Sequence, residues 1–365
     1  MIDAIRFYGL GKLGLPLASL FASSGIRVFG IDTDAGHVET LQADGGRFDE
    51  PGLGVLLGLA SGNLTFHSAA PKEPAQASII HVPTPSSPDA PRFSSSIVEA
   101  AIESACKAAL EDATPVWPHL IVVASTLMPG TFHERLLPLA ARLSEGRDER
   151  FVLSYVPDLV AIGDVIRGFR RPPALIIGAD DPGASVMTRA LYARVVDRDV
   201  RHANVSLAEA ELSKVAWNFF FCLKIDFANQ LARLADGLGG INVDKVVECL
   251  ALDARVGRGF LKAGMPFGGP CFPRDVRAMM ALCGGEDSSL ATAVAQGNEF
   301  AAGLRRRPGN RCQAPARRHS RAGLQAGHGR DNPVTIFRLD RRTCGARCRR
   351  GRLRPFARGD RRATT

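Results

Sequence analysis

Short apolar runs separate longer, helix-patterned segments in the first half of the chain. Runs of four to six residues rich in Val, Ile, Leu and Phe predict buried strands at 4–8, 26–31, 78–82, 120–124, 151–155 and 174–177. Helical stretches lie between them, for example at 15–24, 96–110 and 131–143. Strands that alternate with helices in this way predict a parallel sheet covered by helices, so we expect an α/β fold.

A longer, largely apolar segment at 206–235 predicts one long helix, which Gly237, Gly239 or Gly240 can end. A helix of this length is suited to join two domains as a spine. The residues that follow predict a mainly helical second domain, and beyond residue 304 the periodic pattern stops. We therefore divide the chain into an α/β domain, a helical domain and an irregular tail, at 1–203, 204–304 and 305–365.

The composition is that of a folded protein with more than one core, because 45% of its 365 residues are hydrophobic. The chain has no run of 18 or more apolar residues and does not open with the basic and apolar regions of a signal peptide. We expect a soluble, cytoplasmic protein without a membrane partner. The eight cysteines form no Cys-x-x-Cys pair, which argues against a disulfide framework and against a metal site.

The net charge of +9 is concentrated in the tail. Residues 305–365 contain 19 Arg and three acidic residues, which leaves 27 basic and 34 acidic residues in 1–304, a net charge of −7. The part of the chain that we expect to fold is therefore acidic. A basic surface for nucleic acid is not predicted for it.

A glycine-rich turn follows the first predicted strand. Its sequence, GLGKLG at residues 9–14, stands between a strand and a helix, as the dinucleotide-binding fingerprint requires. Gly9 permits the tight turn, Gly11 lets a pyrophosphate approach the backbone, and Gly14 lets helix and strand pack closely. Asp32 ends the second strand, 18 residues after Gly14. Its carboxylate can accept hydrogen bonds from both ribose hydroxyls and repels a 2′-phosphate, so the predicted cofactor is NAD.

Cys271 lies in the segment FGGPCFPRD at residues 267–275, beside the cation Arg274 and the carboxylate Asp275. A Gly/Pro turn of this kind can present a side chain to a cleft. A thiolate is a nucleophile and nearby positive charge favours it, while Asp275 can handle protons or position water. The alternative for Cys271 is a buried, inert thiol. To that inert class we assign Cys106, Cys222, Cys249 and Cys283.

The long predicted helix carries a polar stripe. Glu211, Lys214 and Asn218 are spaced i, i+3 and i+7, which places them on one face within two turns. Lys214 and Asn218 together can stabilise an oxyanion or polarise water. Glu211 and Lys214 can equally form an ordinary surface ion pair. The spacing alone leaves both interpretations open.

Taken together, these segments resemble the nucleotide-sugar dehydrogenase family typified by UDP-glucose and GDP-mannose 6-dehydrogenases. The resemblance extends over residues 4–304 and rests on the glycine turn, the cysteine loop and further motifs: EPGL (50–53), VPTPS (82–86), STLMPGT (125–131), AELSK (210–214) with Asn218, and RVG (255–257). Members oxidise a sugar's primary alcohol to a carboxylate with two NAD, as in polysaccharide biosynthesis. The resemblance implies a Rossmann domain at 1–203 and a helical central domain, which mediates dimerisation and carries the cysteine loop, at 204–304.

The resemblance also implies a covalent mechanism. Cys271 would capture the aldehyde as a thiohemiacetal, and a second oxidation would turn it into a thioester that water hydrolyses. Lys214 and Asn218 would stabilise the oxyanion, and Asp275 would assist proton transfer. Thr126 and Asp158 would act on the water.

The same resemblance assigns the binding residues. The residues implied for NAD are Gly9, Gly11, Lys12, Leu13, Gly14, Asp32, Thr84 and Thr126. The residues implied for the nucleotide sugar are Lys214, Asn218, Arg255, Phe267 and Gly268. Arg255 matches an arginine that reaches the substrate site of the neighbouring subunit, so a homodimer is implied.

One motif departs from the family pattern. Residues 156–160 read VPDLV, where the family usually has Asn-Pro-Glu-Phe-Leu with a glutamate that acts in thioester hydrolysis. Asp158 is one methylene shorter than that glutamate. A misplacement of about 1 Å can cost on the order of 10²-fold in rate, so we do not expect normal activity from this segment.

The tail does not show the nucleotide-binding domain that follows in the family and begins with a strand and a Phe-Lys-Pro-Gly-Thr-Asp-like turn. Its Arg, Gly, Pro and Ala content is too poor in apolar residues for a core. Read one base later, the codons of residues 323–330 are compatible with that turn. We therefore hypothesise a frameshift near residue 305 and a chain that binds NAD but turns over weakly or not at all. The alternative is an Arg-rich nucleic-acid arm, with only Phe337 and Phe356 to stack on bases.

The leading functional hypothesis is a UDP-glucose 6-dehydrogenase, because residues 268–275 resemble that branch of the family. GDP-mannose stays open as the substrate. A two-electron hydroxyacid dehydrogenase of the 6-phosphogluconate type is an alternative, since it shares the glycine turn and a Lys/Asn helix but needs no cysteine. A third alternative is a non-catalytic protein that binds NAD or nucleic acid.

Overall fold

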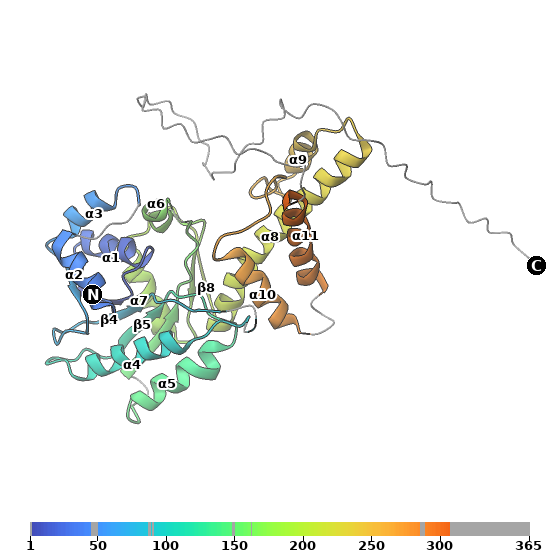
Figure 1. Ribbon diagram of the computed structural model, residues 1–365. Coiled ribbons are helices and arrows are strands. Elements are labelled where there is room, and N and C mark those ends of the chain that lie inside the picture. The colour runs from blue at the N-terminus through green and yellow to red at the C-terminus, as the bar shows by residue number, and fades with distance from the viewer. Residues whose placement is uncertain are drawn as a thin grey trace, which may run out of the picture. The chain divides into compact units, whose positions relative to one another are not determined.

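The computed structural model describes residues 2–306 except 45–49, 87, 88, 90, 148, 149, 162 and 285–288. The described residues belong to one compact unit, in which a sheet domain is followed by a long helix and a helical domain (Figure 1). The mixed α/β class predicted from the sequence is confirmed. The frameshift and the nucleic-acid arm concern the tail, and residues 307–365 lie outside the described part of the chain.

The described strands form one eight-stranded sheet in the order β3-β2-β1-β4-β5-β6-β7-β8. Their bounds are β1 (Ala4–Tyr8), β2 (Arg27–Ile31), β3 (Leu64–His67), β4 (Ala77–Ile80), β5 (His119–Val123), β6 (Phe151–Tyr155), β7 (Leu175–Gly178) and β8 (His202–Val205). The strands from β3 to β6 pair in parallel. β1 and β4 are neighbours although β2 and β3 lie between them in the chain, so the strand order reverses between β1 and β4.

The prediction of a wholly parallel sheet is wrong at one edge. β7 runs antiparallel to β6, with Tyr155 opposite Gly178, and β8 is parallel to β7. The described residues between β6 and β7 contain one short helix, α6 (Val165–Arg170). An antiparallel return is possible over such a connection without a full crossover, and antiparallel edge strands are common on otherwise parallel sheets.

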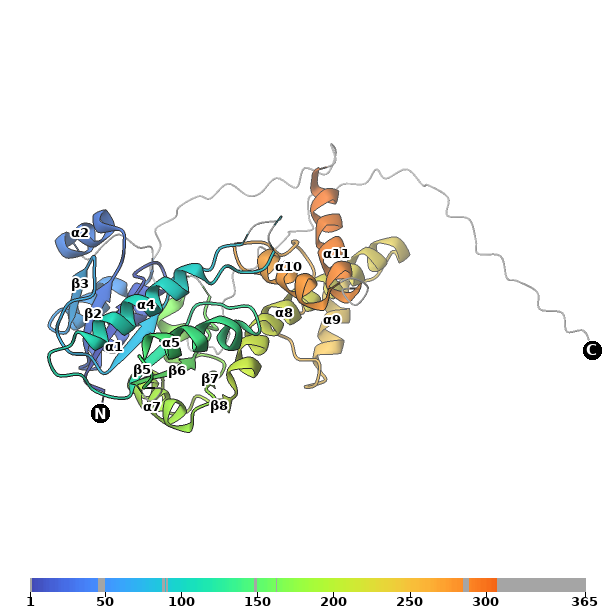
Figure 2. The same ribbon diagram turned by 90° about the horizontal axis from the view of Figure 1, so that it is seen from below.

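Helices cover both faces of the sheet (Figures 1 and 2). Every residue of β1 and β5 is buried, because these strands are packed on both sides. One apolar core joins the sheet to α1 (Gly14–Ser23), α2 (Ala35–Asp44), α3 (Leu53–Ala60), α6 and α7 (Pro182–Tyr192). The other core joins it to α4 (Ser96–Leu110), the π-helical turn η1 (Phe132–Leu136) and α5 (Leu137–Leu143).

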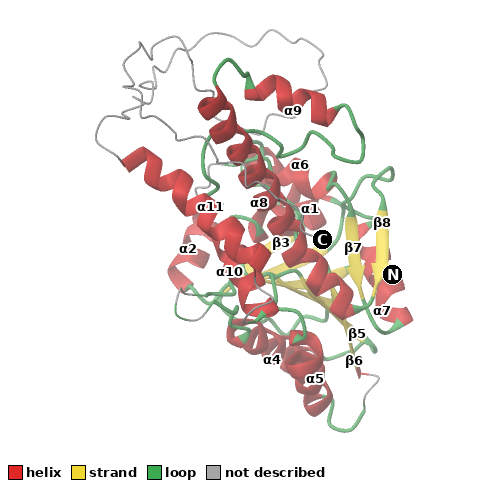
Figure 3. Ribbon diagram, turned by 90° about the vertical axis from the view of Figure 1, so that its right-hand side faces the viewer, coloured by secondary structure: helices red, strands yellow, loops and turns green. Residues whose placement is uncertain are grey.

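The long helix α8 (Leu207–Leu238) begins and ends as its sequence predicts. Ser206 and Glu209 form a capping box at its start, and Gly239, with φ +74°, follows its last residue. α9 (Val243–Ala251), α10 (Phe272–Cys283) and α11 (Ser289–Arg306) pack against α8 (Figure 3). None of the described helices is long and apolar enough to cross a membrane.

Candidate active site

The glycine turn between β1 and α1 is closed toward the sheet and open on its outer side. Gly9 has φ +96°, and a Cβ there would lie 2.2 Å from the carbonyl oxygen of His81. A Cβ on Gly14 would lie 2.0 Å from the carbonyl oxygen of Gly9, so both positions require glycine. A Cβ on Gly11 would meet no described atom within 4 Å. The start of α1 therefore has the free space that a pyrophosphate needs.

The carboxylate of Asp32 is held at this turn. Its Oδ2 accepts from the backbone N–H of Leu10 at 2.9 Å, and its Oδ1 accepts from the N–H of Asp34 at 3.1 Å. Both bonds fix the carboxylate beside the turn at the end of β2. The open turn and the anchored carboxylate together fit the pyrophosphate and ribose of NAD. Of the other predicted NAD residues in this turn, Lys12 is exposed and Leu13 is half-buried.

Three loops at the carboxyl ends of neighbouring parallel strands form the next part of the site. They follow β4, β5 and β6, and carry Thr84, Thr126 and Asp158 respectively. Ser125 joins the first two loops, because its hydroxyl accepts from the N–H of Val82 at 2.9 Å and donates to the Val82 carbonyl at 2.7 Å. Thr84 is buried and Thr126 is half-buried. These loops lie next to the point between β1 and β4 where the strand order reverses. Open α/β sheets bind ligands at such a point.

Lys214 links α8 to the third loop. Its side chain is 8% exposed, and its Nζ donates to the backbone carbonyl of Asp158 at 2.5 Å. Burial lowers the pKa of Lys214, while attraction by Asp158, Asp275 and Cys271 opposes that shift in part. The cation is thus surrounded by groups from the sheet edge and from the cysteine loop.

Asp275 in the first turn of α10 is the second centre of the site. It is fully buried, and its Oδ2 accepts from the Asn218 amide at 2.6 Å. Its Oδ1 accepts from the Arg274 guanidinium at 2.9 Å, and that guanidinium lies over the ring of Phe93 at 4.5 Å. One carboxylate oxygen of Asp275 is therefore bonded to an amide and the other to a guanidinium.

Cys271 is exposed and occupies the N-cap position of α10. Its carbonyl oxygen accepts from the Asp275 N–H at 2.8 Å, so the two residues belong to the same helical turn. The alternative that Cys271 is buried is wrong, and its reactivity stays a prediction. Burial raises the pKa of the Cys106 and Cys222 thiols to about 12, as an inert class requires. Cys249 and Cys283 are exposed, so their assignment to the buried class is wrong.

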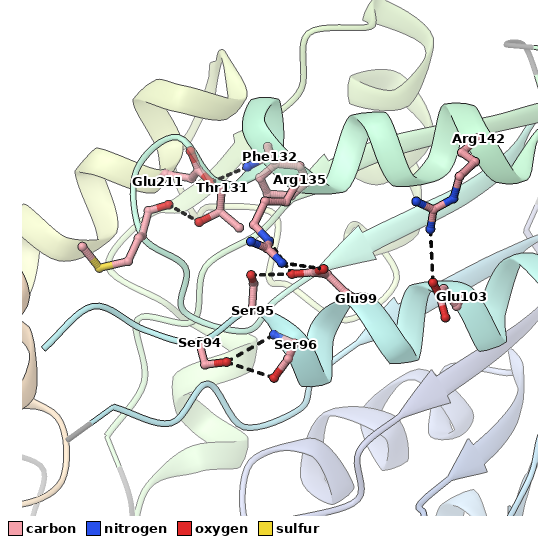
Figure 4. A network of polar contacts seen from close by, with 11 residues as sticks. Ser94, Ser95, Ser96, Glu99, Glu103, Thr131, Phe132, Arg135, Arg142 and Glu211 are labelled. Carbon is pink, nitrogen blue, oxygen red and sulfur yellow. Dashed lines mark hydrogen bonds and ion pairs between the residues drawn. The ribbon is translucent and has the colours of Figure 1, made fainter. Parts of the chain in front are cut away.

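Glu211 does not form the surface pair with Lys214 that its spacing allowed. It is fully buried, and its carboxylate accepts from the N–H of Gly130 at 2.7 Å. It also accepts from the N–H of Phe132 at 3.0 Å (Figure 4). Burial raises its pKa, and the two amide donors oppose that shift. The first turns of α8 face the sheet domain, so Glu211 holds the turn that follows Thr126 rather than meeting solvent.

The sequence analysis did not single out His81. Its Nε2 lies 2.5 Å from the Asp158 Oδ2, with side chains 12% and 13% exposed. Burial lowers the pKa of His81, but the charge and hydrogen bond of Asp158 outweigh burial, so its pKa is raised. The sequence could have pointed to His81 because this histidine directly follows a buried strand at the edge where ligands bind. Its partner Asp158 is 77 residues away in the chain, so the pair itself could not be found.

In the described part of the chain, three predicted substrate residues take no part in the hydrogen bonds that join Lys214 to Asp158 and Asn218 to Asp275. Arg255 is 90% exposed, and within the described chain its guanidinium binds Asp253 at 2.6 Å. Phe267 is buried, and its backbone N–H and carbonyl both bond to the Asn298 side chain, at 2.7 and 3.0 Å. Gly268 is exposed beside it. The structure thus places Phe267 and Gly268 in the cysteine loop and Arg255 on the surface.

Known proteins match the chain over both domains. The NAD binding domain of the UDP-glucose/GDP-mannose dehydrogenase family matches residues 3–196, and the central domain of that family matches residues 208–300. A UDP-glucose 6-dehydrogenase of Pseudomonas aeruginosa is 32% identical over 294 residues, or 78% of this chain and 63% of that protein. A GDP-mannose 6-dehydrogenase of Azotobacter vinelandii is 28% identical over 287 residues, or 75% and 63%.

A solved structure shows the same likeness in three dimensions. A UDP-glucose dehydrogenase from the archaeon Pyrobaculum islandicum has a TM-score of 0.72 and 34% identity, covering 82% of this chain and 68% of that one. The chain matches 63% of the length of the two curated relatives.

Proposed function

Since the chain belongs to the UDP-glucose/GDP-mannose dehydrogenase family, we propose that it oxidises the C6 alcohol of a nucleotide sugar to a carboxylate through Cys271. The observation that carries this proposal is the arrangement around Lys214. That buried cation donates to the Asp158 carbonyl in the loop after β6, and the charges of Asp275 and of a Cys271 thiolate at the start of α10 would favour its protonated form. A nucleophile, a cation and a buried carboxylate therefore meet at one edge of the NAD-binding domain.

NAD, when bound, accepts the hydride that leaves C6 of the sugar. The outer side of the glycine turn, at Gly11, and the first amides of α1 are the groups that would hold its pyrophosphate. Asp32 would bind the adenosine ribose and exclude a 2′-phosphate, because its carboxylate is anchored beside that turn. Thr84 and Thr126 stand on the loops that would border the cofactor.

The residues of the helical domain would perform the covalent steps. The Cys271 sulfur would attack the aldehyde carbon to form a thiohemiacetal. Loss of a hydride from its carbon to a second NAD, and of the proton from its hydroxyl group, would leave a thioester. The Lys214 ammonium and the Asn218 amide stabilise the oxyanion, a contribution of about 10²–10³ in rate per donor. Asp275 keeps Asn218 in place through its 2.6 Å hydrogen bond and is placed to take part in proton transfer.

The sugar nucleotide is the finer part of the proposal. We infer UDP-glucose, because the cysteine loop resembles that branch, and GDP-mannose is a second candidate because a GDP-mannose 6-dehydrogenase is 28% identical. Separate incubations with NAD and each nucleotide sugar, followed by mass spectrometry of the product, test both. Formation of UDP-glucuronate supports the first assignment. Oxidation of GDP-mannose alone contradicts it. No oxidation of either sugar, by this chain or by a chain with the restored reading frame, contradicts the proposed activity.

We also propose that the partner is a second copy of this chain. α8 carries large apolar side chains that are exposed, Phe220, Phe227, Leu234 and Leu238, spaced by seven, seven and four residues. This spacing places them on one side of the helix, as in a helix that packs on another helix. The exposed Arg255 would then reach the partner's substrate site. Light scattering measures the molar mass in solution, and a mass of one chain contradicts the proposed dimer. Phe227→Asp should convert the dimer to monomer.

A further inference from the structure

The His81 and Asp158 side chains meet across the end of an intervening strand. His81 follows β4 and Asp158 comes after β6, while β5 lies between these two strands in the sheet. Neighbouring strands are about 4.8 Å apart, so an imidazole and a short carboxylate together cover a separation of about 10 Å. The pair therefore lies over the end of β5, from which Ser125 and Thr126 continue.

Asp158 is held at two points. Its carboxylate bonds to the His81 imidazole and its backbone carbonyl bonds to the Lys214 ammonium, each at 2.5 Å. A Cys271 thiolate would in turn favour the charge of Lys214. Lys214 is thus common to the His81–Asp158 pair and to the electrostatic surroundings of Cys271, and the His81 ring also stacks on Phe7, with ring centroids 6.1 Å apart.

The charged groups around the pair come from several elements. Lys214 belongs to α8, and Cys271, Arg274 and Asp275 belong to the start of α10. Burial, with a smaller contribution from Asp158, raises the pKa of the phenols of Tyr155 on β6 and Tyr192 on α7, so both stay neutral. The carboxylate of Asp158 is therefore the charged group that favours a proton on His81, through its charge and its hydrogen bond.

Resting on the proposed function, we propose that His81 is a positioning residue for thioester hydrolysis: it acts through Asp158, and the His81–Asp158 pair accepts the proton of the attacking water. The water oxygen forms a bond to the thioester carbon, and one water proton passes to the pair. The bond between carbon and sulfur then breaks, Cys271 leaves as the thiolate, and the remaining proton of the new carboxylic acid goes to solvent. No electrons are exchanged in this step.

The pair gives hydrolysis a pH dependence that a lone aspartate would not. A free aspartate titrates near 3.9 and would be fully available above about pH 5. The pair can take a proton only when His81 is not already protonated, and its raised pKa places that titration above 6.5. Hydrolysis should therefore increase with pH through an inflection above 6.5.

Deacylation of Cys271 tests this role without nucleotide sugar or NAD. p-Nitrophenyl acetate transfers its acetyl group to a reactive thiol, and intact-mass spectrometry follows the loss of acetyl at each pH; Cys271→Ser identifies the acylated residue. His81→Gln keeps a donor for Asp158 but cannot take up a proton. We expect its deacylation to be about 10² slower and to lose the inflection above 6.5. His133→Gln is the matched control, because His133 forms an exposed pair with Asp180 at 2.9 Å.

Each outcome decides between the proposals. Deacylation of His81→Gln with the wild-type rate and pH profile overturns the role of His81 and leaves Cys271 as the nucleophile. Failure of the ester to acylate Cys271 overturns the proposed function and this inference with it. Should His81→Gln not fold, an NMR titration of His81 replaces it: Asp158→Asn should lower the His81 pKa, and an unchanged value overturns the pairing.

Discussion

The Lys214 ammonium donates to the Asp158 carbonyl across 2.5 Å and thereby ties the long helix α8 to the sheet domain. Lys214 is 8% exposed, and burial lowers its pKa. A buried cation bonded to a backbone carbonyl keeps its charge at a fixed position, where charge that develops on an oxyanion can be stabilised without rearrangement. The same contact therefore holds α8 against the sheet domain and positions the ammonium group for an oxyanion.

Lys214→Met should lower the turnover number by about 10²–10³ and leave NAD affinity unchanged, because the oxyanion loses its cation while the glycine turn is untouched. It should also cost about 1–3 kcal/mol of unfolding free energy, since the Asp158 carbonyl loses its partner. Steady-state kinetics, calorimetric NAD titration and urea unfolding measure these effects. Lys262→Met, at an exposed lysine, is the control. Equal turnover in both variants would exclude Lys214 from the oxidation steps.

Asp32→Ala should shift cofactor preference toward NADP. The variant loses a charged acceptor for the ribose hydroxyls and no longer repels a 2′-phosphate. A hydrogen bond to a charged group contributes about 1.5–3 kcal/mol, so the ratio of NAD to NADP affinity should fall about 10- to 100-fold. Calorimetric titrations with both dinucleotides measure the ratio, with Asp236→Asn at an exposed position as control. An unchanged ratio would show that Asp32 does not meet the ribose.

His119 should make the fold sensitive to mild acid. Burial, and secondarily the Arg6 charge, lower its pKa to about 3, whereas an unfolded histidine titrates near 6.5. The unfolded chain therefore takes up a proton below 6.5 that the folded chain does not, and stability falls as the pH falls.

Comparison of wild type with His119→Gln isolates this effect. Wild type should lose about 2 kcal/mol more unfolding free energy than the variant between pH 7 and pH 5. Urea unfolding at both pH values measures the difference, and His202→Gln, at an exposed histidine, should behave like wild type. Parallel losses in wild type and His119→Gln would mean that His119 is protonated in the folded protein.

Buried strands and the long helix were predictable because their patterns are local. The strands at Ala4–Tyr8 and Phe151–Tyr155 and the helix Ser96–Leu110 agree with the predicted bounds. β3 and β8 were missed because they are short edge strands with exposed or half-buried positions, which leave no continuous apolar run. The antiparallel direction of β7 is a property of its connection, and no local pattern encodes it.

The candidate site was predictable where neighbouring residues in the sequence act together. The glycine turn and the cysteine loop are of this kind: Gly9 and Gly14 stand where a Cβ would clash, and Cys271 is exposed at the start of α10. His81 with Asp158 and Glu211 with Gly130 are separated by 77 and 81 positions, so only the folded chain brings them together. The spacing of Glu211 and Lys214 suggested a surface pair because helix periodicity does not show which neighbour covers that face.

Restoration of the reading frame should increase activity toward the nucleotide sugar. The frameshift hypothesis predicts that the coding DNA, read one base later from about residue 305, encodes the nucleotide-binding domain of the family. A protein made from that frame should have a higher kcat/KM for UDP-glucose, while its NAD affinity equals that of the present chain. DNA sequencing and kinetics of both proteins measure this. Normal turnover by the chain as written would contradict the hypothesis.

The number of NADH formed per sugar tests the role of Cys271 most directly. Limiting UDP-glucose is incubated to completion with excess NAD, and NADH is measured by absorbance against product by chromatography. Wild type should form two NADH per UDP-glucuronate, and Cys271→Ser should form at most one per sugar and no uronate, because no thioester can arise. One NADH per sugar in wild type, or two in Cys271→Ser, would contradict oxidation through a covalent intermediate on Cys271.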